Sequence, residues 1–267
     1  GDLPLVAVGP PGDDHRRGPF DGKTAAITGA GSGIGQALAE ALARQGASLA
    51  LVDVDEDGLA ATAARCEGQG GKVRTQIVDV ADADRVQAWA DSVVDEFGAV
   101  HLVVNNAGVA LGATVDAMSL EDAHWLMDIN FWGVVHGTKA FLPHLLAVGE
   151  GHIVNVSSVF GLVSIPTQSA YNASKFAVRG FTDALRLELD LADTDVTCST
   201  VHPGGVRTGI VRNARFDEES AGLAGDADER AARFHKAART SPERAAEIIL
   251  DGVVRKRRRI LIGPDAG

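Results

Sequence analysis

The chain has 267 residues, of which 45% are hydrophobic and 23% are charged, and its formal net charge at pH 7 is −11. This length and composition are typical of one globular α/β domain with a sizeable core. The negative charge argues against nucleic acid as the main partner, because phosphate binding requires a basic surface.

Residues 1–20 are rich in Pro and Gly, and we predict that they form a flexible arm outside the core. Strand-like and helix-like segments alternate after this arm. The predicted strands are 24–28, 48–54, 73–80, 101–107, 152–158, 196–201 and 259–263. The predicted helices are 34–45, 56–67, 83–97, 120–146, 170–191 and 242–254. Because several strands are apolar throughout, this alternation predicts a Rossmann-like, doubly wound parallel sheet of seven strands, forming a single domain over 21–267.

Two segments depart from this simple alternation. The stretch at about 208–240 is long for a connection between a strand and a helix, so we predict a lid over the site, with a plain surface loop as the alternative. The basic run Arg255–Arg259 follows the last predicted helix. Positive charge is favourable at a helix C-terminus, so we interpret this run as a solvated helix end rather than a nucleic-acid or targeting patch.

The sequence gives no sign of a membrane span or a metal site. No apolar run approaches the roughly 18 residues of a membrane-spanning helix, and the opening GDLPLVAV lacks the basic region of a signal peptide. Cys66 and Cys198 form no C-x-x-C pair, which suits a reducing compartment. The eight histidines show no ligand spacing. We therefore expect a cytoplasmic protein that uses no metal and binds neither membrane nor nucleic acid.

The first predicted strand leads into the glycine-rich stretch TGAGSGIG, residues 28–35. Gly29, Gly33 and Gly35 follow the pattern G-x-x-x-G-x-G. Glycine allows a tight turn and a close approach of the backbone to a ligand, and the helix that follows presents N–H groups to a phosphate. A purely structural turn is the alternative, but the position between the first strand and the first helix favours a dinucleotide.

Two aspartates end the next two predicted strands. Asp53 lies 18 residues beyond Gly35, where a carboxylate can accept hydrogen bonds from the ribose of adenosine. A solvated strand end is the alternative for Asp53. Asp79 closes the third predicted strand and is either a helix-capping residue or an adenine contact.

Tyr171 is the only tyrosine of the chain, and Lys175 follows it by four residues in the stretch YNASK. In a helix these two side chains share a face, near an N-terminus that Ser169 could cap. A neighbouring ammonium and the positive helix end both favour tyrosinate, so we expect a lowered pKa for Tyr171 and a role in proton transfer. An ordinary pair on a helix surface is the alternative.

Other polar motifs are predicted to meet Tyr171 at the carboxyl edge of the sheet, where open α/β sheets bind ligands. NNAG (105–108) ends the fourth strand, NVSS places Ser157 and Ser158 at the end of the fifth, and HPGGVRT (202–208) ends the sixth. Asn130 lies inside a long predicted helix, where asparagine is a modest helix former.

Taken together, residues 20–263 resemble the single-domain type of the short-chain dehydrogenase/reductase family. The resemblance rests on TGAGSGIG, Asp53, NNAG, Asn130, Ser158 with YNASK, and the segment Pro203–Thr208. It implies that Tyr171 is the general acid/base, that Ser158 binds the substrate oxygen, that Lys175 holds the nicotinamide ribose, and that Asn130 supports a proton-relay water. The implied cofactor contacts are Gly29, Ser32, Gly33, Ile34, Gly35, Asp53, Asp79, Val80, Asn106, Gly108, Tyr171, Lys175, Pro203, Val206 and Thr208.

We therefore expect an NAD-dependent oxidoreductase that interconverts a secondary alcohol and a ketone on a mainly apolar small molecule. The expected pocket walls, besides the lid, are Val109, Leu111, Phe131, Trp132, Phe160 and Leu162. The family resemblance also implies a homotetramer with helices 120–146 and 170–191 at an interface. The alternatives are an epimerase or dehalogenase on the same fold and a non-catalytic nicotinamide-sensing module.

Overall fold

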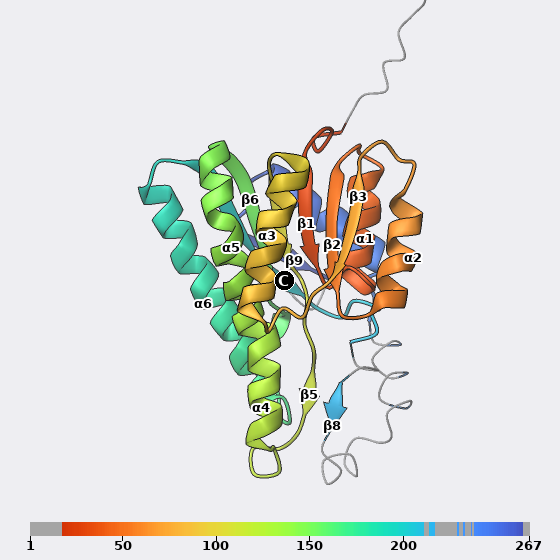
Figure 1. The fold of residues 1–267 in the computed structure, drawn as a ribbon. Coiled ribbons are helices and arrows are strands. Elements are labelled where there is room, and N and C mark those ends of the chain that lie inside the picture. The colour runs from red at the N-terminus through yellow and green to blue at the C-terminus, as the bar shows by residue number, and fades with distance from the viewer. Residues whose placement is uncertain are drawn as a thin grey trace, which may run out of the picture.

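A computed structural model describes residues 18–210, 214–216, 229, 232, 236 and 238–263. Within these residues seven parallel strands form one sheet in the order β3-β2-β1-β4-β6-β7-β9 (Figure 1). The strands are β1 (Thr24–Thr28), β2 (Ser48–Asp53), β3 (Val73–Ile77), β4 (Leu102–Asn105), β6 (Glu150–Val156), β7 (Asp195–Pro203) and β9 (Arg259–Ile262). This order confirms the expected Rossmann-like, doubly wound parallel sheet.

Helices cover both faces of the sheet, as the apolar strands require. One face packs against α1 (Gly33–Ala43), α2 (Glu56–Cys66) and α9 (Pro242–Val254), and the other packs against α3 (Ala83–Phe97), α5 (Gly133–Val148) and α6 (Ser169–Leu191). Successive strand residues alternate between the two cores: Leu51 belongs to the first and Val52 to the second. In the second core the rings of Trp89 and Phe141 meet edge to face, with centroids 4.9 Å apart.

The order of the strands reverses beside β1. The chain runs outward from β1 through β2 to β3, and then returns to place β4 on the other side of β1. The crevice at the carboxyl ends of β1 and β4 is the place where such sheets bind ligands. The glycine-rich stretch follows β1 at this point and NNAG follows β4.

The long helix predicted at 120–146 is interrupted. The chain forms α4 (Leu120–Met127), a π-helical turn (Asp128–Trp132) and then α5. A π turn holds one more residue than an α turn, so it rotates the face that the following side chains present. Asn130 lies in this turn and is fully buried.

A second, two-stranded sheet was not predicted from the sequence. The strands β5 (Leu111–Gly112) and β8 (Arg215–Phe216) pair in parallel below the main sheet (Figure 1). Arg215 also forms an ion pair of 2.7 Å with Asp122 and lies 3.8 Å from the centre of the Trp125 ring. These contacts attach residues 215–216 to α4. Most of the predicted lid at 208–240 lies outside the described residues.

The predicted arm is likewise mostly outside the described residues, which begin at Gly18. At its end, Phe20 is buried and belongs to the hydrophobic core, so the packed part of the chain begins at or before this residue.

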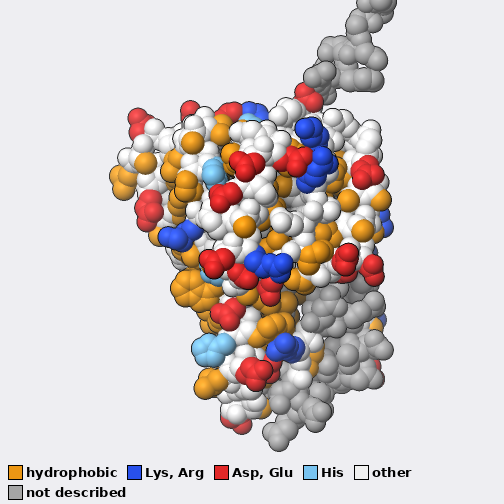
Figure 2. Space-filling model, in the orientation of Figure 1, with side chains coloured by type: hydrophobic (Ala, Val, Ile, Leu, Met, Phe, Trp, Pro, Cys, Tyr) orange, Lys and Arg blue, Asp and Glu red, His pale blue; other side chains and the backbone are white. Residues whose placement is uncertain are grey.

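The basic run after α9 is paired with carboxylates. Arg258 and Arg259 contact Asp183, while Arg255 and Arg257 contact Asp251. Figure 2 shows acidic and basic side chains interspersed over the described part of one face. Among the described helices, none combines the length and the apolar character that crossing a bilayer requires.

Candidate active site

The glycine-rich stretch folds as a tight turn from β1 into α1. Gly29 and Gly33 have φ angles of 65° and 55°, a left-handed conformation that favours glycine. At Gly35 an added Cβ would fall on the carbonyl oxygen of Gly29, so only glycine allows the two segments to approach this closely. Ile34, which lies between Gly33 and Gly35, is buried in the core.

The N-terminus of α1 has no side-chain cap. Ser32 occupies the N-cap position, but its hydroxyl makes no capping hydrogen bond and the first turn of α1 holds no acidic residue. The first backbone N–H groups of α1 therefore have neither a capping side chain nor an acidic residue in the helix's own first turn. Such an end suits a phosphate group.

Asp53 faces the same turn. Its Oδ2 accepts a hydrogen bond of 2.8 Å from the backbone N–H of Gly31, and its Oδ1 accepts from the N–H groups of Val54 and Asp55. Asp53 therefore joins the glycine-rich turn to the end of β2, which is more than a solvated strand end would do.

Asp79 and Val80 follow β3, which ends earlier than predicted, at Ile77. Asp79 Oδ1 accepts a hydrogen bond of 3.0 Å from Ala81 N, within the turn before α3. The capping alternative is wrong, because the N-cap of α3 is Asp82, whose side chain accepts from Arg85 N. Val80 is buried, and its carbonyl oxygen accepts a hydrogen bond from Nδ1 of His136. A contact of either residue with adenine stays a prediction.

The segment after β4 is tied to the glycine-rich turn. The Asn106 amide donates to the carbonyl oxygens of Thr28 and Gly29, at 3.0 and 3.1 Å. Two residues further on, a Cβ on Gly108 would lie 3.3 Å from Asn130 Oδ1 and 3.4 Å from Lys175 Nζ. Gly108 therefore lies beside the ends of two side chains that come from other segments.

The motif after β7 reaches the same place. Pro203 is the last residue of β7, Val206 is buried and bridges to Thr240, and a Cβ on Gly33 would lie 3.1 Å from Cγ2 of Thr208. All the predicted cofactor contacts therefore lie along one edge of the sheet.

Ser158 and Tyr171 are brought together, as the sequence predicted. Both side chains are buried. Burial raises the pKa of Tyr171, and hydrogen bonding by the Ser158 hydroxyl opposes this rise only in part. The expected lowering of the tyrosine pKa is therefore wrong for the protein without ligands, because loss of hydration outweighs any attraction to Lys175.

Lys175 is a buried cation with little compensation. Its Nζ donates a hydrogen bond of 3.1 Å to Val156 O and lies 5.6 Å from the centre of the Tyr171 ring. Within the part of the chain that the structure describes, no carboxylate pairs with it. Burial lowers the pKa of Lys175 to about 8, since the charged form loses its hydration.

Asn130 is held by the loop after β4. Its Oδ1 accepts a hydrogen bond of 2.8 Å from Val109 N, and its Nδ2 donates to Val109 O at 2.9 Å and to Ser174 Oγ at 3.3 Å. The side chain is thus fixed between the π turn, the β4 loop and α6. The support of a proton-relay water by Asn130 stays a prediction.

His202 is a residue of this site that sequence reasoning did not select. The Nδ1 atom of His202 donates a hydrogen bond of 2.9 Å to the carbonyl oxygen of Ser158, and the ring is fully buried. Burial lowers the pKa of His202, so the neutral ring is favoured. The sequence hint was its place at the end of β7, directly before Pro203.

Apolar side chains surround the Tyr171 ring. Phe160 meets it edge to face, with centroids 6.2 Å apart, and Leu111 packs in the same cluster. The other members of this cluster are Val109, Ala110, Met118, Ala123, Trp125, Leu126, Ala170 and Ile210. Sequence reasoning had selected Val109, Leu111 and Phe160 but not Trp125, Leu126 or Ile210.

Two of the predicted pocket walls pack elsewhere. Phe131 meets Phe181 edge to face, and Trp132 stacks on His136 and is 47% exposed. The π turn accounts for this, because it rotates these residues away from the face that a continuous α-helix would present.

The residues present fit a nicotinamide dinucleotide. Lys175 is buried with spare N–H donors, and the N-terminus of α1 lacks a capping side chain. Each feature lowers the stability of the protein alone and would be compensated by a ligand that carries hydroxyl and phosphate groups.

Comparison with known proteins identifies the family. A family model described as short chain dehydrogenase matches residues 23–219. The chain belongs to the short-chain dehydrogenase family and is an oxidoreductase. SadH of Mycobacterium tuberculosis is 50% identical over 249 residues, which cover 92% of this chain and 88% of that protein.

Two further proteins resemble this chain. A cyclohexanol dehydrogenase from Acinetobacter sp. is 36% identical over 201 residues, covering 74% of this chain and 78% of its own. The crystal structure of a short-chain dehydrogenase/reductase from Burkholderia phymatum in complex with NAD has a TM-score of 0.86 and 37% identity, covering 92% of this chain and 90% of that one.

Proposed function

We propose that this chain is an NAD-dependent dehydrogenase/reductase that interconverts a secondary alcohol and a ketone, with Tyr171 as general acid/base. The observation that carries this proposal is the burial of the Ser158 and Tyr171 hydroxyl groups beside Lys175, with Tyr171 in an apolar cluster. A purely structural pair would not require a buried cation next to it.

The roles of the residues follow from their chemistry. The nicotinamide, when bound, supplies the hydride acceptor or donor. Ser158 holds the substrate oxygen by a hydrogen bond, and Tyr171 takes the proton of the alcohol or returns it to the ketone oxygen. Lys175 donates hydrogen bonds to the nicotinamide ribose and favours tyrosinate once that ribose and substrate are in place. Asn130 keeps the π turn against the site.

NAD is proposed as the cofactor because of Asp53. Its carboxylate lies at the end of β2 and contacts the glycine-rich turn, where the adenosine ribose is expected. The 2′-phosphate of NADP would bring a second anion to this carboxylate. The Burkholderia phymatum relative was solved with NAD.

The substrate is proposed to be an alicyclic or aliphatic secondary alcohol, or the corresponding ketone. The side chains around Tyr171 are mainly apolar, with Leu111, Phe160 and Trp125 among them. The name of the Acinetobacter relative, cyclohexanol dehydrogenase, points to the same class.

The decisive experiment is a screen of alcohols with NAD and of ketones with NADH, followed by nicotinamide absorbance. Alicyclic secondary alcohols should be oxidised faster than primary alcohols of the same carbon number. An enzyme that turns over none of these compounds but changes the configuration of a substrate without net change in nicotinamide absorbance would contradict the proposal.

We also propose a cytoplasmic homotetramer in which α5 and α6 contribute to an interface. Apolar side chains on these helices are exposed, among them Leu146, Phe176, Leu187 and Leu191. Light scattering of the purified protein should give four times the chain mass of 27.7 kDa. A monomeric mass would contradict this part of the proposal.

A further inference from the structure

The segment between Ser158 and Tyr171 is fastened to one face of α6 by side chains. Ser157 Oγ donates a hydrogen bond of 2.8 Å to the carbonyl oxygen of Lys175. One helical turn later, Nη1 of Arg179 donates to the carbonyl oxygen of Gly161, at 3.0 Å. Gly161 lies so close to α6 that an added Cβ would be 2.7 Å from the same Lys175 carbonyl oxygen.

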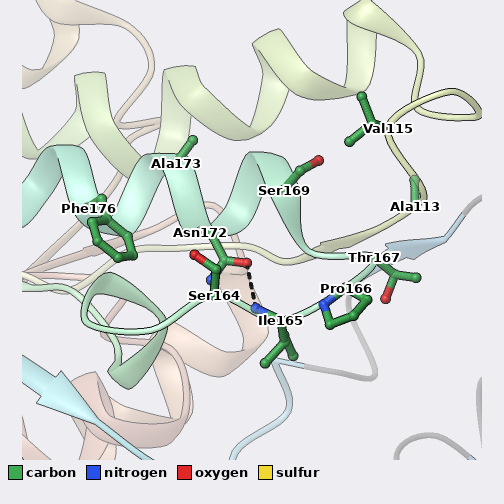
Figure 3. Close-up of a pocket in the computed structure, with 10 residues that line it drawn as sticks. All are labelled: Ala113, Val115, Ser164, Ile165, Pro166, Thr167, Ser169, Asn172, Ala173 and Phe176. Carbon is green, nitrogen blue, oxygen red and sulfur yellow. Dashed lines mark hydrogen bonds between the residues drawn. The ribbon is translucent and has the colours of Figure 1, made fainter.

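The central contact of this arrangement is Asn172, the residue after the proposed catalytic tyrosine. Its Nδ2 donates hydrogen bonds to the carbonyl oxygens of Phe160 and Val163, at 3.0 and 3.1 Å. Its Oδ1 accepts from the backbone N–H of Ile165, at 3.4 Å (Figure 3). One buried amide thus binds three backbone groups of the same segment.

We propose that Asn172 is a positioning residue, which fixes residues 159–165 so that Ser158 and Phe160 face Tyr171. This proposal rests on the proposed function, because it assigns Asn172 a part in bringing the two hydroxyl groups together. Asn172 itself acts through the segment and touches neither reacting group.

The coupling from Asn172 to Ser158 passes through a single residue. The N–H of Phe160 donates a hydrogen bond of 3.1 Å to Ser158 Oγ, while its carbonyl oxygen accepts from Asn172. The ring of Phe160 packs edge to face on Tyr171. A shift of Phe160 would therefore move the Ser158 hydroxyl and the apolar wall together.

Packing from outside does not hold this segment in place. A pocket of about 510 Å³ lies on its outer side, lined by Ala113, Val115, Ser164, Ile165, Pro166, Thr167, Ser169, Asn172, Ala173 and Phe176 (Figure 3). Val163 and Ile165 are 53% and 41% exposed. Thr167 has a φ of 64°, which is strained for a β-branched residue. Hydrogen bonds from α6 must therefore supply the order that a packed core supplies elsewhere.

Two substitutions of Asn172 test the proposal. In Asn172→Ala all three hydrogen bonds are lost. In the isosteric Asn172→Asp the acceptor for Ile165 remains, but the two donors are replaced by a carboxylate that faces carbonyl oxygens. Misplacement of a reacting group by about 1 Å lowers the rate by roughly 10²-fold, so we expect both variants to lose 10- to 100-fold in kcat.

The measurement must separate positioning from stability. kcat is expressed per NAD-binding site, counted by fluorescence titration, so that unfolded protein does not contribute. The dissociation constant of NAD should stay within about threefold of wild type, since Asn172 contacts none of the proposed cofactor residues except through α6. The control is Leu189→Ala, which removes a buried side chain of the same helix 18 residues from Tyr171. It should lower the melting temperature and leave kcat per site unchanged.

A second variant covers the case in which Asn172→Ala does not fold. Arg179→Met removes the hydrogen bond to Gly161 and the cation–π contact with the Phe176 ring while keeping an apolar side chain of similar length, so a loss of about three- to tenfold in kcat is expected. Folded variants of Asn172 and Arg179 with wild-type kcat per site would overturn the proposal.

Amide hydrogen exchange distinguishes failure of this proposal from failure of the proposed function. In Asn172→Ala, exchange should accelerate at residues 160–165 and remain unchanged in the distal part of α6, at 180–189. This result requires no turnover. If exchange changes as expected but the wild type oxidises no alcohol, the proposed function fails and the fastening of the segment stands. Unchanged exchange at 160–165 would refute the fastening whatever the activity.

Discussion

The N-termini of helices α1 and α6 differ from those of α2, α3, α4 and α9. Each of the latter four begins with a side chain that accepts a hydrogen bond from the first turn, and each has an acidic residue in that turn. The four capping residues are Asp55, Asp82, Ser119 and Ser241. Helices α1 and α6 have neither a capping side chain nor an acidic residue in the first turn.

We interpret this difference as stability given up for the proposed binding of cofactor and substrate. A cap contributes roughly 0.5–2 kcal/mol, and an acidic residue in the first turn adds a further favourable interaction with the helix dipole. The two uncapped helices are those that carry the glycine-rich turn and Tyr171 with Lys175. Helix α5 is not part of the comparison, because it continues directly from the π turn.

The largest expected effect concerns Tyr171, at the start of uncapped α6. Tyr171→Phe removes only the hydroxyl, so kcat should fall by roughly 10²–10⁴-fold while the dissociation constant of NAD stays nearly unchanged. Stopped-flow turnover and fluorescence titration of the cofactor give the two quantities. A variant that retains more than about a tenth of the wild-type rate would refute general acid/base catalysis by Tyr171.

Replacement of Lys175 should raise the stability of the protein while it weakens cofactor binding. Burial lowers its folded pKa to about 8, so the fold disfavours the charged form at neutral pH. Lys175→Met should therefore raise the unfolding free energy of the cofactor-free protein by about 1–3 kcal/mol at pH 7, and should weaken cofactor binding and turnover.

The pH dependence of the stability gained by Lys175→Met tests whether the gain comes from removal of the buried charge. The penalty on wild type is fully present below the folded pKa of about 8 and is lost as pH rises toward the unfolded value of 10.5. The stability difference between Lys175→Met and wild type, measured by urea unfolding, should therefore shrink between pH 8 and pH 10.5. A constant difference over this range would assign the effect to packing instead of charge.

Asp53 provides a test at the N-terminus of α1. Its carboxylate contacts the glycine-rich turn beside this helix but does not cap the helix. Wild type should prefer NAD over NADP by about 10²-fold in kcat/KM, since two unit charges 4 Å apart repel by about 4 kcal/mol at an effective dielectric of 20. Asp53→Ala should have a lower kcat/KM with NAD, and the ratio of kcat/KM with NAD to that with NADP should fall.

Asp53→Asn is the matched control for this residue. The amide oxygen can still accept from Gly31, so the turn keeps this contact, while the charge and the acceptor for the N–H groups of Val54 and Asp55 are lost. Asp53→Asn should also lower the preference for NAD over NADP, but its kcat/KM with NAD should fall less than that of Asp53→Ala. Equal use of both cofactors by wild type would remove Asp53 from this role.

The sequence was sufficient for the sheet because its signals are local. Apolar runs such as 24–28 and 102–105 lie between glycine- and asparagine-containing turns, and parallel pairing then follows from the intervening helices. The polar motifs gather because each follows a strand, and the carboxyl ends of parallel strands lie along one edge.

What the sequence could not provide depends on distance and burial. The direction of the Tyr171 pKa depends on how completely the ring is buried, which spacing alone does not show. The π turn has nearly the same apolar periodicity as an α-helix, so Phe131 and Trp132 were assigned to the wrong face. The two-residue pairing of β5 with β8 is too short for a pattern, and the contacts of Asn172 span a loop whose course no local signal fixes.

The smallest effect, and the most direct test of the comparison, comes from giving α1 the cap that it lacks. Ser32→Asp places a carboxylate at the N-cap, where it can accept from the N–H groups of the first turn and interact with the helix dipole. The unfolding free energy of the cofactor-free protein should rise by roughly 0.5–1 kcal/mol. The same carboxylate would occupy the proposed place of the cofactor pyrophosphate, so NAD binding should weaken by about tenfold or more.

Two controls accompany Ser32→Asp: one removes the charge of the new cap, and the other changes a cap at a different helix. Ser32→Asn offers a neutral cap of similar shape and should stabilise α1 while retaining more NAD affinity than Ser32→Asp. Ser119→Ala removes a cap from α4, whose N-terminus bears none of the proposed cofactor contacts, and should lower stability with NAD affinity unchanged. Because affinity and stability are expected to move in opposite directions for the cap of α1 but not for the cap of α4, the pair of measurements distinguishes a binding site from an accidental gap in capping. If Ser32→Asp binds NAD as tightly as wild type, the pyrophosphate does not lie at this helix end, and the interpretation of the uncapped N-termini is wrong.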